Sequence, residues 1–212
     1  QGFFVAIEGL DGAGTTTQTD LLVDRLVSAG IGAHATREPS DGPIGALIRQ
    51  MLSGRIRGSV GSDEEFGRAT LALLFAADRL DHLDSEVRPA LREGATVVTD
   101  RYYYSSFAYQ STAGADGEPD LDWVRAVNDR ARPPDLTIFL EASADLCIER
   151  MGNRVRRDVF EERSRLERLE QRYEAVVSAL EREGHPVERF DADRRRRALA
   201  DDIFRAVLDR RR

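Results

Sequence analysis

The sequence predicts an α/β protein with three layers, in which a five-stranded parallel sheet is covered by helices on both faces. Short apolar runs of strand length alternate with stretches of helical periodicity along the whole chain. The apolar runs are nearly continuous, which is typical of strands that are covered on both faces. A chain of 212 residues is long enough for one such core. We therefore expect a single domain over residues 1–212.

The elements follow from this alternation in chain order. The expected strands are Phe3–Glu8, Gly32–Thr36, Thr96–Asp100, Leu136–Leu140 and Val187–Phe190. The expected helices are Thr16–Ala29, Pro43–Ser53, Asp63–Arg92, Tyr104–Thr112, Leu121–Ala131, Ala144–Met151, Glu161–Arg182 and Arg195–Arg210. Segments rich in glycine, proline or polar residues indicate loops at Gly54–Gly61, Ser111–Pro119 and Arg132–Pro134.

Composition narrows the class of protein. Hydrophobic residues make up 41% and charged residues 33%, as in globular proteins, and the longest apolar runs are too short to cross a membrane. The chain enters its first strand without a basic leading region, so we expect no signal peptide. The net charge of −7 argues against nonspecific binding to nucleic acid. We interpret the basic runs Arg194–Arg197 and Arg210–Arg212 as solvated helix ends, where cations suit the helix dipole.

Two features of residue usage matter for the site. The one cysteine, Cys147, excludes an intramolecular disulfide, which fits a reducing cytoplasm, and we expect a buried structural thiol. All 31 cationic residues are arginine, and the chain has no lysine. The base composition of the genome or an adaptation to salt would explain this usage without reference to function.

A phosphate-binding loop follows the first predicted strand. Residues 9–16 have the spacing of G-x-x-x-x-G-K-[ST] between an apolar run and a helical stretch. Gly9 and Gly14 allow the tight turn and the close approach of backbone to phosphate, and Thr16 supplies the hydroxyl that normally joins the Mg²⁺ shell. Thr15 stands where the pattern has lysine, so only backbone amides and the helix N-terminus remain to hold phosphate oxygens. An ordinary glycine-rich turn is the alternative.

Charged residues also follow two other predicted strands. Asp100 and Arg101 end the third strand, and Arg37 follows the second. Ligands bind at the carboxyl ends of strands in open α/β sheets, so Asp100 could reach Mg²⁺ through water and the arginines could bind phosphate. A structural ion pair at Asp100 and Arg101, and a surface turn at Arg37, are the alternatives.

Two more segments are candidates for nucleotide binding. Phe75 and Arg79 share one helical face, where a ring could stack on a base and a guanidinium could bond its carbonyl oxygens. Core packing and a salt bridge would explain the same pair. Four arginines surround a glycine within residues 150–157, which indicates a flap at about 150–158 that closes on polyphosphate and replaces the missing cation. A solvated charged linker would have the same composition.

In their order along the chain, these segments resemble the thymidylate kinase family of phosphate-loop nucleoside-monophosphate kinases. The matching pieces are Glu8–Gly14, Thr36–Pro39, Leu74–Arg79, Asp100–Gln110 and the arginine-rich flap. The resemblance implies the P-loop NTPase fold, ATP and dTMP as substrates, Mg²⁺ as cofactor, a cytoplasmic location and a homodimer formed through the Asp63–Arg92 region. Gly12 and the basic flap are similar to the family variant that carries its arginines in the flap.

The resemblance also implies a role for each matching residue. The residues expected at dTMP are Asp11 at the sugar hydroxyl, Arg37 and Arg101 at the phosphate, Phe75, Arg79, Ser106 and Gln110 at the base, and Tyr109 at the deoxyribose. Those expected at ATP are Gly9, Gly12, Ala13, Gly14, Thr15, Thr16 and Thr17 of the loop, with Arg150, Arg154 and Arg157. Thr16 and Asp100 are expected to serve Mg²⁺. Asp11, Arg101, Arg154 and Arg157 are the expected catalytic residues.

The family normally keeps lysine where Thr15 stands, and loss of such a contact costs several kcal/mol of transition-state stabilisation, roughly the effect of one electrostatic donor. The remaining set is present together, so we expect an active kinase that transfers the ATP γ-phosphoryl group to dTMP, with Arg154 or Arg157 supplying the missing charge. Two alternatives remain open. One is a nucleotide-binding pseudoenzyme without transfer activity, and the other is a kinase for a different pyrimidine nucleotide or deoxynucleoside.

Overall fold

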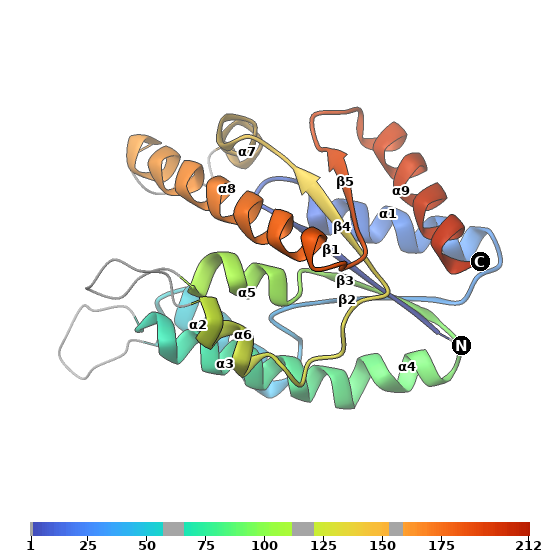
Figure 1. Cartoon of the computed structure of the whole chain (residues 1–212), viewed down its shortest axis with the longest axis horizontal. Coiled ribbons are helices and arrows are strands. Elements are labelled where there is room, and N and C mark those ends of the chain that lie inside the picture. Colours follow the sequence, from blue (N-terminus) through green and yellow to red (C-terminus); the bar gives the residue numbers. More distant parts are fainter. Residues whose placement is uncertain (1, 57–65, 112–120, 153–158) are drawn as a thin grey trace.

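The computed structural model describes residues 2–56, 66–111, 121–152 and 159–212, and it is built on one parallel sheet (Figure 1). Its strands are β1 (Phe3–Gly9), β2 (Ala33–Arg37), β3 (Thr96–Asp100), β4 (Leu136–Glu141) and β5 (Val187–Asp191). They lie in the order β2-β3-β1-β4-β5, and every neighbouring pair is parallel. The predicted five-stranded parallel sheet is confirmed, and each strand begins and ends within one residue of its expected bounds.

Helices cover both faces of the sheet, which confirms the three-layer arrangement (Figure 1). On one face α1 (Thr15–Ser28) packs beside α9 (Arg196–Arg211). The other face is covered by α5 (Tyr103–Gln110) and α8 (Val159–Arg182), which pack on each other, and α3 (Arg68–His82) packs on α5. Three shorter helices flank these layers, namely α2 (Pro43–Leu52) beside α3, α6 (Leu121–Val127) beside α5, and α7 (Ala144–Met151) beside α8. Within the described residues, every helix is too short or too polar to span a lipid bilayer.

Two predicted helices differ from the structure. Of the stretch expected to be one helix over Asp63–Arg92, residues 63–65 lie outside the described residues, and the rest contains α3, then a π-helical turn η1 (Leu83–Val87) and the short helix α4 (Arg88–Arg92). Pro89 lies in the first turn of α4, and because proline has no N–H it cannot continue the α-helical hydrogen bonding from α3. The helix expected to reach Ala131 ends at Val127. The side-chain amide of Asn128 donates to the carbonyl of Val124 (2.8 Å) and caps that end.

The central strand β1 sends alternate residues into two hydrophobic clusters. Val5 and Ile7 belong to the cluster that contains residues of α1 and α9, whereas Phe4 belongs to the cluster that contains residues of α5. Side chains of a strand alternate between its faces, so Glu8 lies on the side of Phe4. Glu8 is fully buried. The fold therefore places a carboxylate under α5, directly before the predicted phosphate loop.

Candidate active site

Two cavities open at the carboxyl edge of the sheet, and they share two residues. The first, of about 770 Å³, is lined by the loop between β1 and α1 and by the segment after β5, and we call it the loop cavity. The second, of about 730 Å³, is lined by residues of α3, α5 and the segment after β2, and we call it the helix cavity. Asp11 and Arg101 line both cavities. Groups bound in the two cavities can therefore meet beside this pair.

A third cavity, of about 530 Å³, lies between β4 and α8 and is lined by several glutamates. Its carboxylates are already engaged with the protein. Glu141 and Glu174 accept hydrogen bonds from Arg189, and Glu170 accepts one from the backbone N–H of Ala144. The unengaged polar groups described below lie around the other two cavities.

The loop after β1 follows the predicted phosphate-binding geometry. Gly12 has φ = +91°, and a Cβ there would lie 2.8 Å from the carbonyl oxygen of Cys147, so only glycine fits. Gly14, at φ = +101°, is the N-cap of α1. Cys147 is fully buried, as expected, and burial raises the pKa of its thiol to about 11. The loop cavity is lined by the predicted residues Asp11, Gly12, Ala13, Gly14, Thr15, Thr16 and Thr17.

Thr16 and Asp100, the two residues expected at Mg²⁺, are brought together by the fold. The Thr16 hydroxyl donates a short hydrogen bond to Oδ2 of Asp100, and both residues line the loop cavity. The other oxygen of Asp100, Oδ1, is buried and has no hydrogen-bond partner among the described residues. A hydroxyl and a carboxylate are hard oxygen ligands of the kind that Mg²⁺ prefers, so this pair fits the predicted ion.

Arg101 ties the phosphate loop to the helices of the opposite layer. Its Nη2 donates to Oδ1 of Asp11 (2.7 Å), and its Nη1 donates to the carbonyl of Gly9 (2.9 Å). The same Nη1 donates to the hydroxyls of Ser105 and Tyr173, both at 3.1 Å. The backbone of Arg101 has φ = +72°, an unusual conformation for a residue with a side chain. This conformation turns the guanidinium from the end of β3 back toward the loop.

A buried carboxylate lies beneath Arg101. Oε1 of Glu8 accepts hydrogen bonds from the backbone N–H groups of Tyr102 (2.8 Å) and Ser105 (3.2 Å). Oε2 accepts from the hydroxyls of Ser105 (2.6 Å) and Tyr173 (3.2 Å). Burial raises the pKa of Glu8 to about 7, although these hydrogen bonds and the charge of Arg101 act to lower it. Glu8 thus holds the start of α5 and titrates near neutral pH.

The helix cavity contains the residues expected to contact a base. Phe75, Arg79, Ser106, Tyr109 and Gln110 all line it. Oε1 of Gln110 is buried without a hydrogen-bond partner among the described residues, so it is available to a donor on a ligand. The guanidinium of Arg101 lies 5.6 Å from the ring centroid of Tyr109, which joins this wall to the shared pair.

Several arginines surround the loop cavity, although Thr15 brings no charge to it. Arg101, Arg150, Arg194 and Arg196 line this cavity. Arg150 donates to the carbonyl oxygens of Ala13 (3.2 Å) and Ala192 (2.8 Å), so it joins α7 to the loop. Arg154 and Arg157, the residues expected to supply the missing charge, lie outside the described residues.

Our interpretation of Arg194–Arg197 is partly wrong. These residues are exposed, as expected, but they lie at the N-terminal end of α9, where the helix dipole does not favour cations. Arg194 and Arg196 instead line the loop cavity, and Arg194 pairs with Asp202. The prediction failed because it did not consider that this basic run follows β5, so that it lies at the carboxyl edge of the sheet beside the loop cavity.

Arg37 is a predicted site residue whose side chain is engaged outside both cavities. It lies beside Asp100 in the register of β2 and β3, but it pairs with Asp41 (2.6 Å) and its side chain is 58% exposed. It lines neither the loop cavity nor the helix cavity. Its role at an acceptor phosphate stays a prediction.

The residues of the site that were not predicted include Glu8, Arg165 and Tyr173, besides Arg194 and Arg196. Arg165 lines the helix cavity and lies 3.8 Å from Asp11, and Tyr173 bonds both Arg101 and Glu8. Arg165 and Tyr173 belong to α8, far from the loop in sequence. Glu8 did carry a signal, because a charged residue inside a strand covered on both faces must be paired when it is buried.

Comparison with known proteins gives a consistent result. A family model described as thymidylate kinase matches residues 7–189. A probable thymidylate kinase of Pyrobaculum aerophilum is 40% identical over 205 residues, which cover 96% of this chain and 95% of that protein. A probable thymidylate kinase of Caldivirga maquilingensis is 35% identical over 98% of this chain and 94% of that protein. A probable thymidylate kinase of Methanococcus aeolicus is 38% identical over 82% of this chain and 79% of that protein.

Glu8 generates a prediction about stability. The pKa of Glu8 is about 7 in the folded protein, against an ordinary value of 4.5. Between these two pH values the folded state binds more protons than the unfolded state, so the free energy of unfolding falls as pH rises from 4.5 to 7. A shift of this size corresponds to about 3 kcal/mol. In Glu8→Gln, whose amide can donate to the Ser105 and Tyr173 hydroxyls, that fall should disappear. Denaturant unfolding between pH 4.5 and 8 measures this fall in the free energy of unfolding. Glu93→Gln, which changes an exposed glutamate, is the control and should keep the fall. Parallel curves for wild type and Glu8→Gln would contradict the assignment.

Proposed function

The chain belongs to the thymidylate kinase family and is a nucleoside-monophosphate kinase, and on this premise we propose how its two cavities divide the reaction. ATP binds in the loop cavity, and dTMP binds in the helix cavity. The γ-phosphoryl group passes to the dTMP phosphate beside Asp11 and Arg101, which gives ADP and dTDP. The observation that carries this proposal is that Asp11 and Arg101 line both cavities.

On the donor side, the backbone of residues 12–17 receives the phosphates of ATP. The loop opens α1, so its N–H groups and the positive end of the helix dipole favour phosphate oxygens. Thr16 and Asp100 hold Mg²⁺ with the nucleotide. The ion, when bound, neutralises charge that develops on the transferred group. Arg150 is held over the loop through Ala13 and adds a cation at the same phosphates.

On the acceptor side, Phe75 stacks on the thymine ring and Arg79 bonds a carbonyl oxygen of the base. Ser106 and Gln110 read the base edge, and Tyr109 packs at the deoxyribose, where a 2′-hydroxyl would be disfavoured. Arg101 binds the dTMP phosphate, together with Arg37 if the Arg37–Asp41 pair opens. Asp11, which Arg101 orients, contacts the sugar hydroxyl.

The chemistry needs positioned charge rather than a covalent intermediate. The two phosphates of the reaction are brought into line by binding on either side of Arg101. Its guanidinium is fixed by Gly9, Asp11, Ser105 and Tyr173, so it is oriented before substrate binds. Arg154 or Arg157 of the flap supplies the charge that Thr15 lacks, in addition to the arginines that line the loop cavity.

We also propose a homodimer formed through α3 and a cytoplasmic location. Leu73 of α3 and Leu47 of α2 are large apolar side chains with 53% and 39% of their surface exposed, and their helices pack side by side. Exposed apolar groups on adjacent helices suit an interface with a second copy of this chain. The buried free thiol of Cys147 fits a reducing compartment.

The direct test is release of ADP by the purified protein with MgATP and dTMP. We expect turnover in the ordinary kinase range of about 1–100 s⁻¹, with dTMP preferred over dUMP, dCMP and thymidine. Preference for another acceptor would reassign the substrate, and turnover below about 10⁻³ of that range despite nucleotide binding would mean a pseudoenzyme.

The flap arginines give a second prediction. Arg154→Ala or Arg157→Ala should lower kcat by roughly 100-fold and change the KM for dTMP much less, because a transition-state contact is lost. Thr15→Lys should gain little, since the charge is already supplied. Arg163→Ala is the matched control, because Arg163 is exposed on α8 and pairs with Asp145 and Glu167. Full kcat in both flap variants would exclude these residues as the replacement for lysine.

The dimer gives a third prediction. Leu73→Asp should shift the protein to a monomer in sedimentation velocity, because burying an unpaired carboxylate at an apolar interface is costly. Val27→Asp on α1, which is 57% exposed on the opposite face of the sheet, should leave the assembly unchanged. A monomer at all concentrations in the wild-type protein would rule the interface out.

A further inference from the structure

The wall of the helix cavity that faces the base is backed by buried charges. Arg79 is 1% exposed, and four of its five N–H groups have partners. Nε and Nη2 donate to Oε2 of Glu38 (2.8 and 2.6 Å), Nη2 also donates to the Ser106 hydroxyl (3.0 Å), and Nη1 donates a short hydrogen bond to Asn128. The second N–H of Nη1 has no partner among the described residues. The orientation of this donor therefore depends on Glu38.

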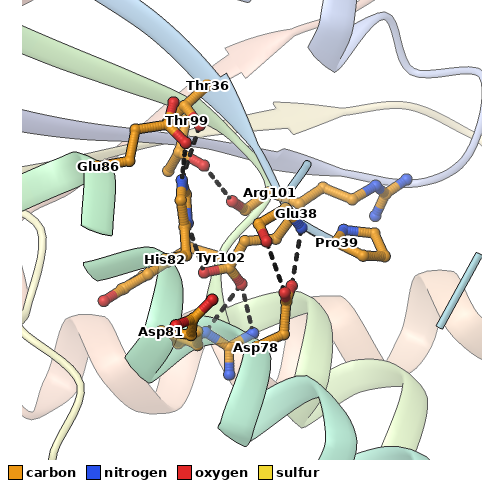
Figure 2. Close-up of polar contacts among 12 residues, drawn as sticks. Thr36, Glu38, Pro39, Asp78, Asp81, His82, Glu86, Thr99, Arg101 and Tyr102 are labelled. Carbon is orange, nitrogen blue, oxygen red and sulfur yellow. Dashed lines mark hydrogen bonds and ion pairs between the residues drawn. The ribbon is translucent and has the colours of Figure 1, made fainter. Parts of the chain in front are cut away.

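Glu38 is shared between Arg79 and a buried histidine. Its second oxygen, Oε1, lies 3.5 Å from Nδ1 of His82, and neither buried atom has a hydrogen-bond partner among the described residues. Both side chains are buried, with 2% of Glu38 and none of His82 exposed. On its other side, Nε2 of His82 is hydrogen-bonded to the Thr36 hydroxyl (2.7 Å). Figure 2 shows His82 between Thr36 and Glu38.

The surroundings of His82 carry more negative than positive charge. Asp78 is fully buried and is held by the backbone N–H and the hydroxyl of Ser40 (2.7 and 2.6 Å). Titratable and charged groups act on His82 from each element around it, namely Glu38 and Asp41 after β2, Asp78 and Arg79 of α3, Glu86 of η1 and His34 of β2. Glu86 lies 3.6 Å from Nε2 of His82, and His34 contacts Glu86 (2.7 Å).

Charge balance favours an imidazolium at this position. Glu38 and Asp78 are two buried carboxylates, and Arg79 alone would neutralise only one of them. An imidazolium donates from both ring nitrogens, and both have an oxygen in front of them, Oε1 of Glu38 and Oγ1 of Thr36. Burial acts to lower the pKa of His82, but the close contact with Glu38 and the charges of Glu38, Glu86 and Asp78 outweigh it and raise the pKa.

We propose that His82 is a positioning residue for the acceptor nucleotide: as an imidazolium it fixes Glu38, and Glu38 orients Arg79 toward the pyrimidine ring. The inference rests on the proposed function, since it takes Arg79 as a contact of the base. His82 does not reach the helix cavity itself, so it acts only through Glu38. It therefore affects binding of the base and leaves the transfer step alone.

A pH dependence follows with a defined sign. The folded pKa of His82 is raised above its ordinary value of 6.5, so its contribution is complete below pH 6.5 and is lost as pH rises through the folded pKa. Loss of the proton leaves Glu38 and Asp78 with one buried cation, and Glu38 then holds Arg79 less firmly. The KM for dTMP should rise with pH in the wild type and not in His82→Gln, whereas the pH dependence of kcat and of the KM for ATP should be the same in both proteins.

The test compares wild type, His82→Gln and the control His34→Gln between pH 6.5 and 9.5. His34 also contacts Glu86, but it is 43% exposed and is not in contact with Glu38. His82→Gln should raise the KM for dTMP by roughly tenfold at pH 6.5, the size expected for one weakened charge-assisted contact, and should remove the rise of this KM with pH. Its kcat and KM for ATP should stay within about twofold of wild type, and His34→Gln should behave as wild type. An unchanged KM for dTMP and an unchanged pH profile in His82→Gln would overturn the inference.

A second measurement needs no variant and no turnover. The chain has three histidines, so ring ¹H–¹⁵N correlations of the wild-type protein can be assigned. The signals of His82 should be those of an imidazolium at pH 6.5, and those of a neutral ring would overturn the proposal. If dTMP is not phosphorylated at all, the proposed function fails, whereas the ring signals still decide the charge of His82. If dTMP is phosphorylated but the KM for dTMP and its pH profile are unchanged in His82→Gln, only the positioning role fails.

Discussion

The site depends on one partly buried guanidinium, that of Arg101, in a backbone conformation that a residue with a side chain seldom adopts. A φ of +72° costs on the order of 1–3 kcal/mol, so it persists only where surrounding contacts hold it. Here the contacts come from the phosphate loop, α5 and α8, through Gly9, Asp11, Ser105 and Tyr173. One side chain thereby joins the loop to the opposite helical layer. It also lies at the boundary between the loop cavity and the helix cavity.

Carboxylates around Arg101 and Arg79 hold these arginines in place, and two of them, Glu8 and Glu38, are buried. Glu8 lies under Arg101, Asp11 pairs with it, and Glu38 holds Arg79. Removing one partner of such a pair leaves an uncompensated charge, which is why each carboxylate carries several hydrogen bonds or a second cation. A chain without lysine can meet the needs of phosphoryl transfer in this way, because a planar guanidinium with several donors is easily fixed by neighbouring oxygens.

The sequence predicted the parts of this site that follow local rules. The glycine spacing located the loop, and the rule that parallel strands present their carboxyl ends at one edge located Asp100 beside Thr16. It did not predict Tyr173 or Arg165, because their place in the site depends on how α8 crosses α5, which no local pattern encodes. It also did not predict the break between α3 and α4, where the missing N–H of Pro89 outweighed a continuous helical periodicity. Tertiary packing decided these cases.

The most direct test of this account is single-turnover transfer by Arg101→Lys, with ATP and dTMP binding measured separately. Lysine keeps the charge but has no fork to engage Gly9, Asp11, Ser105 and Tyr173 at once. The account predicts that both nucleotides still bind and that the transfer rate falls by 100-fold or more, roughly the loss of one oriented electrostatic donor. A folded Arg101→Lys protein that binds both nucleotides and transfers the phosphoryl group at the wild-type rate would contradict it.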